Sequence, residues 1–137
     1  MSGGGLTGGC LCGGVRFEIV GPLGTASYCH CARCQRRTGT AASANVRVDS
    51  GALRVTQGDE LLREFTPEGG APKVFCGTCG SALWSRSPDS TAYGVRLGAF
   101  DTDPGVRPAF RQFVAYAAAW EPIPDDGLPR HPERRPA

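Results

Sequence analysis

Short stretches of alternating hydrophobic and polar residues run through the first hundred positions of the chain. In residues 15–20, apolar side chains occupy every second position and Arg16 and Glu18 lie between them. This period of two predicts a half-buried β-strand. Similar stretches, bounded by glycine, proline or small polar residues, predict further strands over residues 25–28, 41–49, 53–57, 61–66, 73–75, 82–86 and 92–97.

Turn residues separate these predicted strands. The chain contains 20 glycines and 11 prolines, which favours many turns and few long helices. Ser50 and Gly51 predict a hairpin-like turn between two neighbouring strands, and the polar residues 87–90 predict another. Since no internal repeat is visible, the pattern predicts one compact all-β domain of short strands.

Helical signals are few. Residues 31–38 contain little β-branching and precede Gly39, which predicts a short helix that ends at this glycine. Residues 109–120 fit both states, because their alanines allow a helix while their aromatic and branched residues favour a strand.

The two ends of the chain differ from the middle. Residues 1–8 are glycine-rich and are expected to form a flexible lead, and residues 122–137 are rich in proline and arginine and are expected to lack regular structure. The folded domain is therefore expected to span residues 9–121.

The composition of the chain limits its expected partners and its expected cellular location. The chain has 137 residues, 40% of them hydrophobic and 20% charged, which is typical of one soluble domain. The formal net charge of +2 is much smaller than that of a typical polyanion-binding protein, so no nucleic-acid partner is expected. No apolar run approaches the ~20 residues that span a bilayer, so no membrane partner is expected. The glycine-rich residues 1–9 lack the apolar core of an export signal, so no export is expected, and the seven cysteines are an odd number. A cytoplasmic, reducing location follows, in which clustered cysteines bind metal more often than they pair.

Two distant cysteine pairs have the spacing of a structural zinc site. Cys76 and Cys79 are separated by two residues and flanked by glycine, which is typical of a zinc knuckle. A knuckle supplies two ligands, and tetrahedral zinc takes four, so Cys10 and Cys12 are the expected complement. Burial of Cys10 and Cys12 as small apolar residues is the alternative. A redox role for Cys76 and Cys79 is less favoured, because no βαβ pattern surrounds them.

The three remaining cysteines, Cys29, Cys31 and Cys34, lie within six residues of one another. Three protein ligands with an open fourth position are typical of catalytic rather than structural zinc. Because zinc is thiophilic, a small thiol is the expected ligand at the open position. There it would be held as a nucleophile for an electrophile such as an aldehyde. His30 stands between two proposed ligands, so its side chain is expected to face outward or to form hydrogen bonds elsewhere rather than to act as the fourth ligand. An iron–sulfur cluster on the same cysteines is an alternative that the spacing favours less.

Three arginines follow or interleave this triplet. Guanidinium groups at Arg33, Arg36 and Arg37 are expected to lower thiol pKa values and to bind a carboxylate of the thiol ligand. A solvated helical face that balances the thiolate charge is the alternative for each of them.

The cysteine motifs together resemble a known family. Residues 9–17 (GCLCGGVRF), 29–39 (CHCARCQRRTG) and 75–81 (FCGTCGS) occur in the order found in the glutathione-dependent formaldehyde-activating enzyme family, which includes centromere protein V. The resemblance extends over about residues 8–131 and includes the C-terminal motifs at 119–120 and 127–130.

The resemblance implies a compact Mss4-like β fold with two zinc ions per chain. It assigns one ion to the structural set Cys10, Cys12, Cys76 and Cys79, and the other to Cys29, Cys31 and Cys34. The implied activity is a carbon–sulfur lyase reaction in which glutathione and formaldehyde form S-(hydroxymethyl)glutathione. The chain departs from many relatives after Gly39, where they carry an aromatic residue, and at residues 111–113, where they carry a histidine.

Two function classes follow from these motifs. The first is a zinc-dependent carbon–sulfur lyase that acts on a thiol adduct of a small aldehyde, with the triplet as its catalytic site. The second is a non-catalytic, zinc-stabilised module that binds a thiol ligand or a macromolecule. A thiol or zinc sensor based on the triplet is a third hypothesis.

Overall fold

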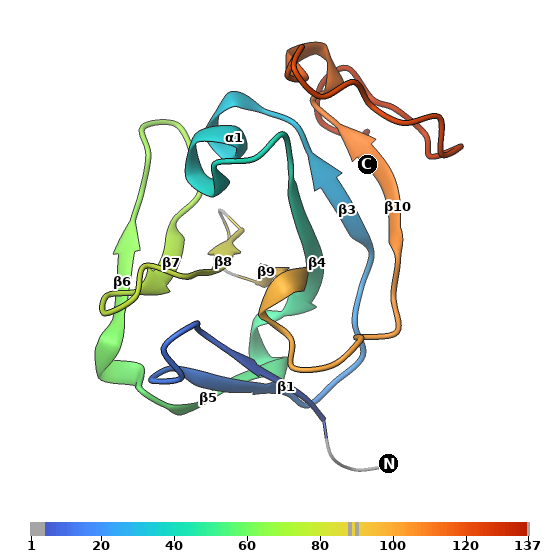
Figure 1. The fold of residues 1–137 in the computed structure, drawn as a ribbon. Coiled ribbons are helices and arrows are strands. Elements are labelled where there is room, and N and C mark those ends of the chain that lie inside the picture. Colours follow the sequence, from blue (N-terminus) through green and yellow to red (C-terminus); the bar gives the residue numbers. More distant parts are fainter. Residues whose placement is uncertain (1–4, 88, 90, 137) are drawn as a thin grey trace.

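The computed structural model describes residues 5–87, 89 and 91–136, which fold mainly into two β-sheets (Figure 1). The smaller sheet has three strands in the order β1-β2-β5, which are β1 (Leu6–Gly9), β2 (Arg16–Ile19) and β5 (Leu53–Gln57). The larger has seven in the order β10-β3-β4-β9-β8-β7-β6. These are β3 (Ala26–Cys29), β4 (Ser43–Asp49), β6 (Leu62–Phe65), β7 (Lys73–Cys76), β8 (Ala82–Arg86), β9 (Ala92–Arg96) and β10 (Pro108–Gln112). The prediction of a mainly β domain is confirmed.

Helical structure among the described residues is short. The α-helix α1 (Ala32–Thr38) follows β3, and Gly39 ends it in the left-handed conformation with a φ of 70°, as the sequence predicts. Four 3₁₀ turns complete the elements, namely η1 (Ser50–Ala52), η2 (Asp59–Leu61), η3 (Leu97–Ala99) and η4 (Val114–Tyr116). None of the helices in the described part of the chain has the length and hydropathy of a bilayer-spanning helix.

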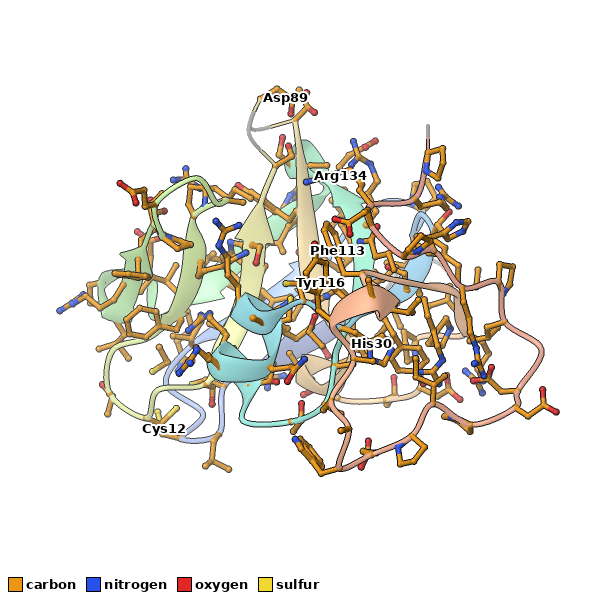
Figure 2. The ribbon with its side chains drawn as sticks, turned by 90° about the horizontal axis from the view of Figure 1, so that it is seen from above. Cys12, His30, Asp89, Phe113, Tyr116 and Arg134 are labelled. Atoms are coloured by element: carbon orange, nitrogen blue, oxygen red, sulfur yellow. The ribbon has the colours of Figure 1, made fainter. Side chains whose placement is uncertain are left out.

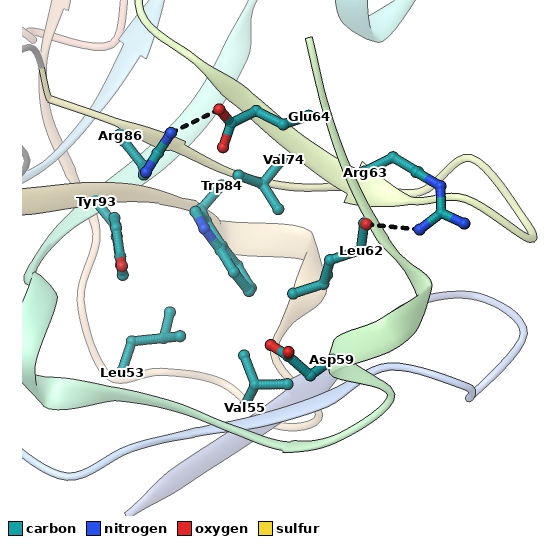
Figure 3. A pocket seen from close by; sticks show the side chains of 10 residues that line it. All are labelled: Leu53, Val55, Asp59, Leu62, Arg63, Glu64, Val74, Trp84, Arg86 and Tyr93. Carbon is teal, nitrogen blue, oxygen red and sulfur yellow. Dashed lines mark hydrogen bonds and ion pairs between the residues drawn. The ribbon is translucent and has the colours of Figure 1, made fainter.

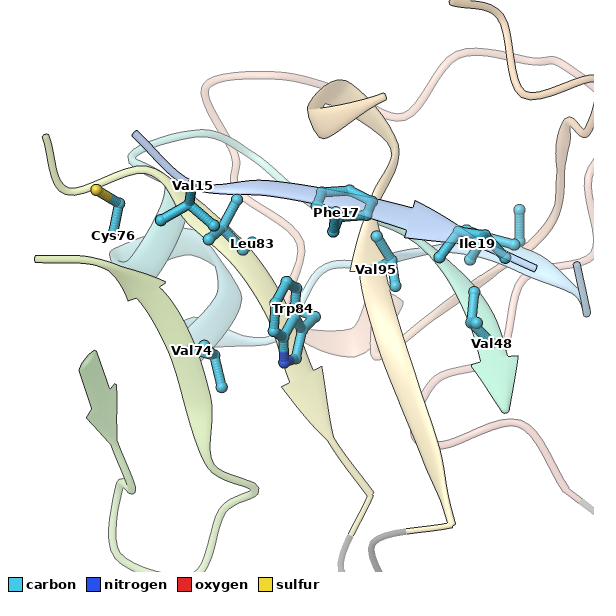
Figure 4. Packing of buried hydrophobic residues seen from close by; sticks show 11 residues of the cluster. Val15, Phe17, Ile19, Val48, Val74, Cys76, Leu83, Trp84 and Val95 are labelled. Atoms are coloured by element: carbon cyan, nitrogen blue, oxygen red, sulfur yellow. The ribbon is translucent and has the colours of Figure 1, made fainter. Parts of the chain in front are cut away.

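The hydrophobic core lies between the two sheets (Figure 4). Val15, Phe17 and Ile19, the apolar half of the first alternating stretch, are at most 1% exposed. Phe17 meets Trp84 of β8 edge to face, with ring centroids 5.8 Å apart. Burial of such side chains stabilises the fold by about 1.5–3 kcal/mol each.

The glycine-rich lead is ordered from Gly5, contrary to the expectation for residues 1–8. Leu6–Gly9 forms strand β1 and pairs antiparallel with β2. A Cβ at Gly8 would lie 2.3 Å from the carbonyl oxygen of Ala99 and 2.5 Å from the Phe17 ring. Glycine is therefore required here by the close approach of the strand to the core. Residues 1–4 of the expected lead lie outside the described residues.

The hairpin predicted at Ser50 and Gly51 is wrong. The two flanking strands belong to different sheets, because η1 redirects the chain between them. β4 pairs instead with β9, where Val46 lies opposite Val95. The turn predicted at 87–90 joins two strands, β8 and β9, that do pair antiparallel; Pro88 and Ser90 within it lie outside the described residues.

The ambiguous stretch 109–120 begins as a strand. β10 runs parallel to β3, and Phe113 then adopts a left-handed conformation with a φ of 59°. The C-terminal residues lie along β10, since the Arg111 amide donates to the Pro129 carbonyl and the His131 amide to the Arg111 carbonyl, both at 2.9 Å. The proline-rich extension thus covers the β10 edge of the larger sheet, although it contains little regular structure.

Candidate metal centres

The fold brings the cysteines together in two clusters. One holds Cys10, Cys12, Cys76 and Cys79, the other Cys29, Cys31 and Cys34, and within each cluster the sulfur atoms lie within 4.8 Å of one another. None of the seven forms a disulfide. Figure 2 labels Cys12 of the first cluster and His30 from the segment of the second, at well-separated places. These groupings are the two that the sequence predicts.

Two tight turns form the four-cysteine cluster. The Cys76 sulfur accepts a hydrogen bond from the Thr78 amide at 3.4 Å, and the Cys10 sulfur accepts one from the Val15 amide at 3.2 Å. Gly80, with a φ of 80°, donates its amide to the Cys76 carbonyl at 2.8 Å. Backbone amides that point at sulfur stabilise the thiolate, which is the form that binds metal.

The two turns are also joined to each other. The Leu11 amide donates to the Ser81 hydroxyl at 2.9 Å, and that hydroxyl lies 3.2 Å from the Cys79 sulfur. The Ser81 hydroxyl and amide lower the pKa of Cys79 to about 5. The cluster therefore ties the chain entering β2 to the β7–β8 turn, and its four sulfur donors suit tetrahedral zinc.

The three-cysteine cluster lies where β3 runs into α1. Cys29 is the last residue of β3 and is buried, and Cys31 is the N-cap of α1. The Cys34 amide donates to the Cys31 sulfur at 3.3 Å. The sulfur is therefore the acceptor that caps the helix N-terminus, where a serine or threonine hydroxyl is more usual. The same contact fixes the position of Cys31 relative to Cys34.

The pKa values of two thiols in this cluster are shifted in opposite directions. Hydrogen bonds from Cys29 and Cys34 lower the pKa of Cys31 to about 2, and the converse bonds raise the pKa of Cys29 far above its usual range. Of these thiols, Cys31 therefore favours the thiolate form. An all-sulfur set of three donors fits zinc and leaves one tetrahedral position for another ligand.

His30 lies outside the sulfur cluster, and of the two expected arrangements it forms hydrogen bonds and does not face outward. The residue is 3% exposed, and its Nε2 lies 3.1 Å from Nη1 of Arg111. Since a guanidinium only donates, Nε2 must accept, which requires a neutral imidazole. Burial, followed by the charge of Arg111, lowers the pKa of His30 and favours that neutral form.

Arg111 connects His30 to the C-terminal segment. Its Nη2 donates to Asp126 at 2.8 Å, and its guanidinium lies 4.3 Å from the centre of the Tyr28 ring. The side chain is 9% exposed, so this charge is both buried and paired. The sequence identified residues 111–113 only as a departure from relatives; the packing of Arg111 against His30 is what the structure adds.

The three arginines expected beside the triplet point in different directions. Arg33 donates from Nη2 to the Glu68 carbonyl at 2.8 Å, and Arg36 is exposed. Arg37 is half-buried and lies 5.4 Å above the Phe75 ring of β7. Only Arg37 of the three is therefore turned toward the face of the large sheet beneath α1.

Two further cations near the triplet were missed by the sequence reasoning. Lys73 of β7 and Arg96 of β9 are half-buried, and the thiol charges of Cys34 and Cys31 act on the pKa of both. Each looks like an ordinary polar position in an alternating strand, so only the strand order shows that both lie on the same face of the large sheet, with β8 between them.

A depression of about 290 Å³ opens elsewhere, at one end of the core between the sheets (Figure 3). Leu53, Val55 and Leu62 line its apolar floor, and the Arg86–Glu64 ion pair lies at its rim. It shares no lining residue with either cysteine cluster, so the candidate chemistry of the molecule lies outside it.

Comparisons with known proteins agree with these clusters. The profile of the family described as "Glutathione-dependent formaldehyde-activating enzyme" matches residues 5–116, which include all seven cysteines. A Halomonas elongata protein, provisionally named for the same activity, is 33% identical over 90 residues, which cover 61% of this chain. The match spans only 57% of that relative's length. The crystal structure of a Rhodobacter sphaeroides protein superposes with a TM-score of 0.58 at 28% identity, over 74% of this chain and 91% of that one.

Proposed function

Because the chain belongs to the glutathione-dependent formaldehyde-activating enzyme family, we propose that it is a zinc-dependent carbon–sulfur lyase that joins a small thiol to an aldehyde. Glutathione and formaldehyde are the proposed pair. The observation that carries the proposal is the cluster of Cys29, Cys31 and Cys34, which is one ligand short of a tetrahedral set.

The proposed reaction forms one carbon–sulfur bond. The thiol sulfur bonds to the aldehyde carbon, the carbonyl π pair moves to oxygen, and the proton lost by the thiol ends on that oxygen, giving S-(hydroxymethyl)glutathione. A zinc ion held by the three cysteines would supply the Lewis acidity that keeps a ligand thiol deprotonated at neutral pH.

The chain's own residues hold and orient this site. The α1 cap contact between Cys31 and the Cys34 amide fixes two donors, and β3 fixes the third at Cys29. On the other side, the buried Arg111 pairs with Asp126 and donates to His30, which holds the segment between Cys29 and Cys31. Preorganised donors reduce the reorganisation that ligand binding would otherwise require.

We propose that the four-cysteine cluster holds a second zinc ion with a structural role. Cys10, Cys12, Cys76 and Cys79 complete a tetrahedral set without an outside ligand, and hydrogen bonds already join their two turns. Two zinc ions per chain follow from this assignment. A reducing compartment such as the cytoplasm is proposed as the location, because it keeps both thiol sets free to bind metal.

The test is the rate of thiol–aldehyde exchange measured by isotope-exchange NMR with formaldehyde and glutathione. The zinc-loaded protein should accelerate exchange well above the uncatalysed rate, and Cys34→Ser should abolish the acceleration. Retention of glutathione by a fully zinc-loaded protein without acceleration would contradict the proposal and support the non-catalytic binding module instead.

A further inference from the structure

The face of the seven-stranded sheet that turns away from the core carries a group of cations beneath α1. Strand pairing places Arg96 of β9 opposite Asn45 of β4. The adjacent pair, Val46 and Val95, points into the core, so Arg96 and Asn45 point to the opposite face. Lys73 of β7 alternates in the same way with the buried Val74. Arg37 reaches this face from α1 and lies over Phe75. The three cations, Arg37, Lys73 and Arg96, are called the cation triad below.

The triad and the cysteine triplet act on each other electrostatically. Burial lowers the pKa of Lys73, the charges of Arg96 and Arg37 lower it further, and the Cys34 thiolate raises it. The pKa of Arg96 responds in the same sense to burial, to Cys34 and to Arg37. The positions of these groups agree with this. Arg37 follows Cys34 by one turn of α1 and lies over Phe75, on the face of β7 that carries Lys73. The helix also packs against β4, whose Asn45 accepts from Arg96, so the triad lies beside the triplet.

The cation triad has more donors than partners. Among the described residues, none of the ion pairs involves Arg37, Lys73 or Arg96. Nη1 of Arg96 donates to Oδ1 of Asn45, but its Nε has no partner, and Nε and Nη2 of Arg37 have none either. Buried guanidinium donors without acceptors are costly, which indicates a site made for an acceptor that a ligand brings.

Charge balance indicates what that acceptor is. Three thiolates on one Zn²⁺ leave a single net negative charge, and a bound thiolate would add a second. The triad carries three positive charges, so one cation remains uncompensated even with both groups present. A carboxylate on the thiol ligand would supply the missing charge, and its two oxygens match the planar fork of a guanidinium.

We propose that Arg37, Lys73 and Arg96 form a carboxylate-binding site that selects acidic thiols for the neighbouring three-cysteine centre. The inference rests on the proposed function for the presence of a thiol, but the carboxylate site itself does not depend on turnover. Asn45 holds Arg96 in place, since it accepts from Arg96 and donates from Nδ2 to the Ser43 hydroxyl at 3.0 Å.

A probe without sulfur tests the site independently of catalysis. γ-Glutamyl-α-aminobutyryl-glycine has a methyl group where glutathione has its thiol, so it cannot bind metal through sulfur. Titration of the zinc-loaded protein by calorimetry should show binding of this acid and at least roughly tenfold weaker binding of its dimethyl ester.

Substitutions then assign the binding to the triad. Arg96→Gln should weaken binding of the acid probe by roughly tenfold or more, because a charge-assisted hydrogen bond is lost, while zinc content stays the same. Arg54→Gln removes the same charge from an exposed position of β5 in the other sheet and should leave the affinity within about twofold. Arg96→Lys keeps the charge and should recover part of the affinity.

Three results would overturn the inference: equal binding of the acid and its ester, unchanged affinity in a folded Arg96→Gln, or loss of the second zinc from that variant. The ester comparison uses the unaltered protein and so decides the matter even if Arg96→Gln does not fold. Failure of the proposed function would look different, because exchange catalysis would be absent while the acid probe still bound in preference to its ester.

Discussion

The two cysteine clusters use the same donor atom in opposite surroundings. Around Cys10, Cys12, Cys76 and Cys79, the partners are backbone amides and one serine hydroxyl, and four sulfurs complete the set. Around Cys29, Cys31 and Cys34, three sulfurs stand beside half-buried arginines that have buried N–H groups without an acceptor among the described residues. Ligand number and neighbouring charge, rather than cysteine content, therefore distinguish the proposed structural centre from the proposed reactive one.

The clusters also differ in what they connect. The first joins segments far apart in the chain. Cys12 lies between β1 and β2 of the smaller sheet and Cys76 ends β7 of the larger one, yet their sulfur atoms are 3.9 Å apart. The second is local, because all its donors lie between the end of β3 and the first turn of α1. Loss of a long-range link affects the whole fold, whereas loss of a local site leaves the core between the sheets intact.

The largest expected effect is therefore that of Cys76→Ser. Structural zinc contributes an apparent free energy on the order of 10–16 kcal/mol to small zinc domains, more than a domain of this size has in reserve. The variant should lose cooperative thermal unfolding by circular dichroism. A Cys76→Ser protein that unfolds cooperatively with two bound zinc ions would contradict the structural assignment.

The matched substitution in the other cluster, Cys34→Ser, should give the opposite pattern. The fold should persist with one zinc ion per chain. Loss of a hydrogen-bond partner of a metal ligand typically lowers activity by roughly 10–100-fold, and loss of the ligand itself should lower the exchange rate by more than that. Metal analysis together with the NMR exchange rate checks this. Substantial activity in a one-zinc Cys34→Ser protein would show that the triplet is not the reactive site.

A smaller effect is expected from Asp126→Asn, which leaves the buried charge of Arg111 without its ion-pair partner. The variant should unfold at a temperature a few degrees lower than the parent at pH 7 and should exchange amide hydrogens faster in the segment along β10. Unaltered protection of that segment would argue that the C-terminal residues are held by other contacts.

The Asp126 effect should also depend on pH. Hydrogen bonds from Arg111 lower the pKa of Asp126 in the folded state, so its contribution is present above the unfolded value of 3.8. It is lost as pH falls through the lowered folded value. The difference in thermal stability between parent and Asp126→Asn should therefore shrink below about pH 4, and a constant difference would mean that the carboxylate charge is not what matters.

The sequence predicts features that depend on residue type and local spacing. The cysteine groupings follow from ligand counting, and the end of α1 follows from Gly39, because both are decided within a few residues. Strand pairing is different. Alternation reveals which face of a strand is buried but not its neighbour, so the Ser50–Gly51 hairpin was expected where η1 instead leads into the other sheet.

The same limit explains the residues that sequence reasoning missed. Lys73 and Arg96 lie on one face near the triplet only because β7, β8 and β9 are neighbours in one sheet. Arg33 and Arg36 are near the triplet in sequence, yet the helix turns them away from the face on which Arg37 lies. Proximity along the chain was thus a weaker guide to the charged surroundings of the site than strand order.

Zinc content per chain during chelation tests the central claim most directly. We predict two zinc ions per chain, one that a mild chelator removes while circular dichroism still reports a folded protein, and one that leaves only as the domain unfolds. Added glutathione should slow removal of the first ion alone, because a thiol at the open position completes its ligand set. A single zinc ion, or two that leave together with unfolding, would contradict the division into a structural and a reactive centre.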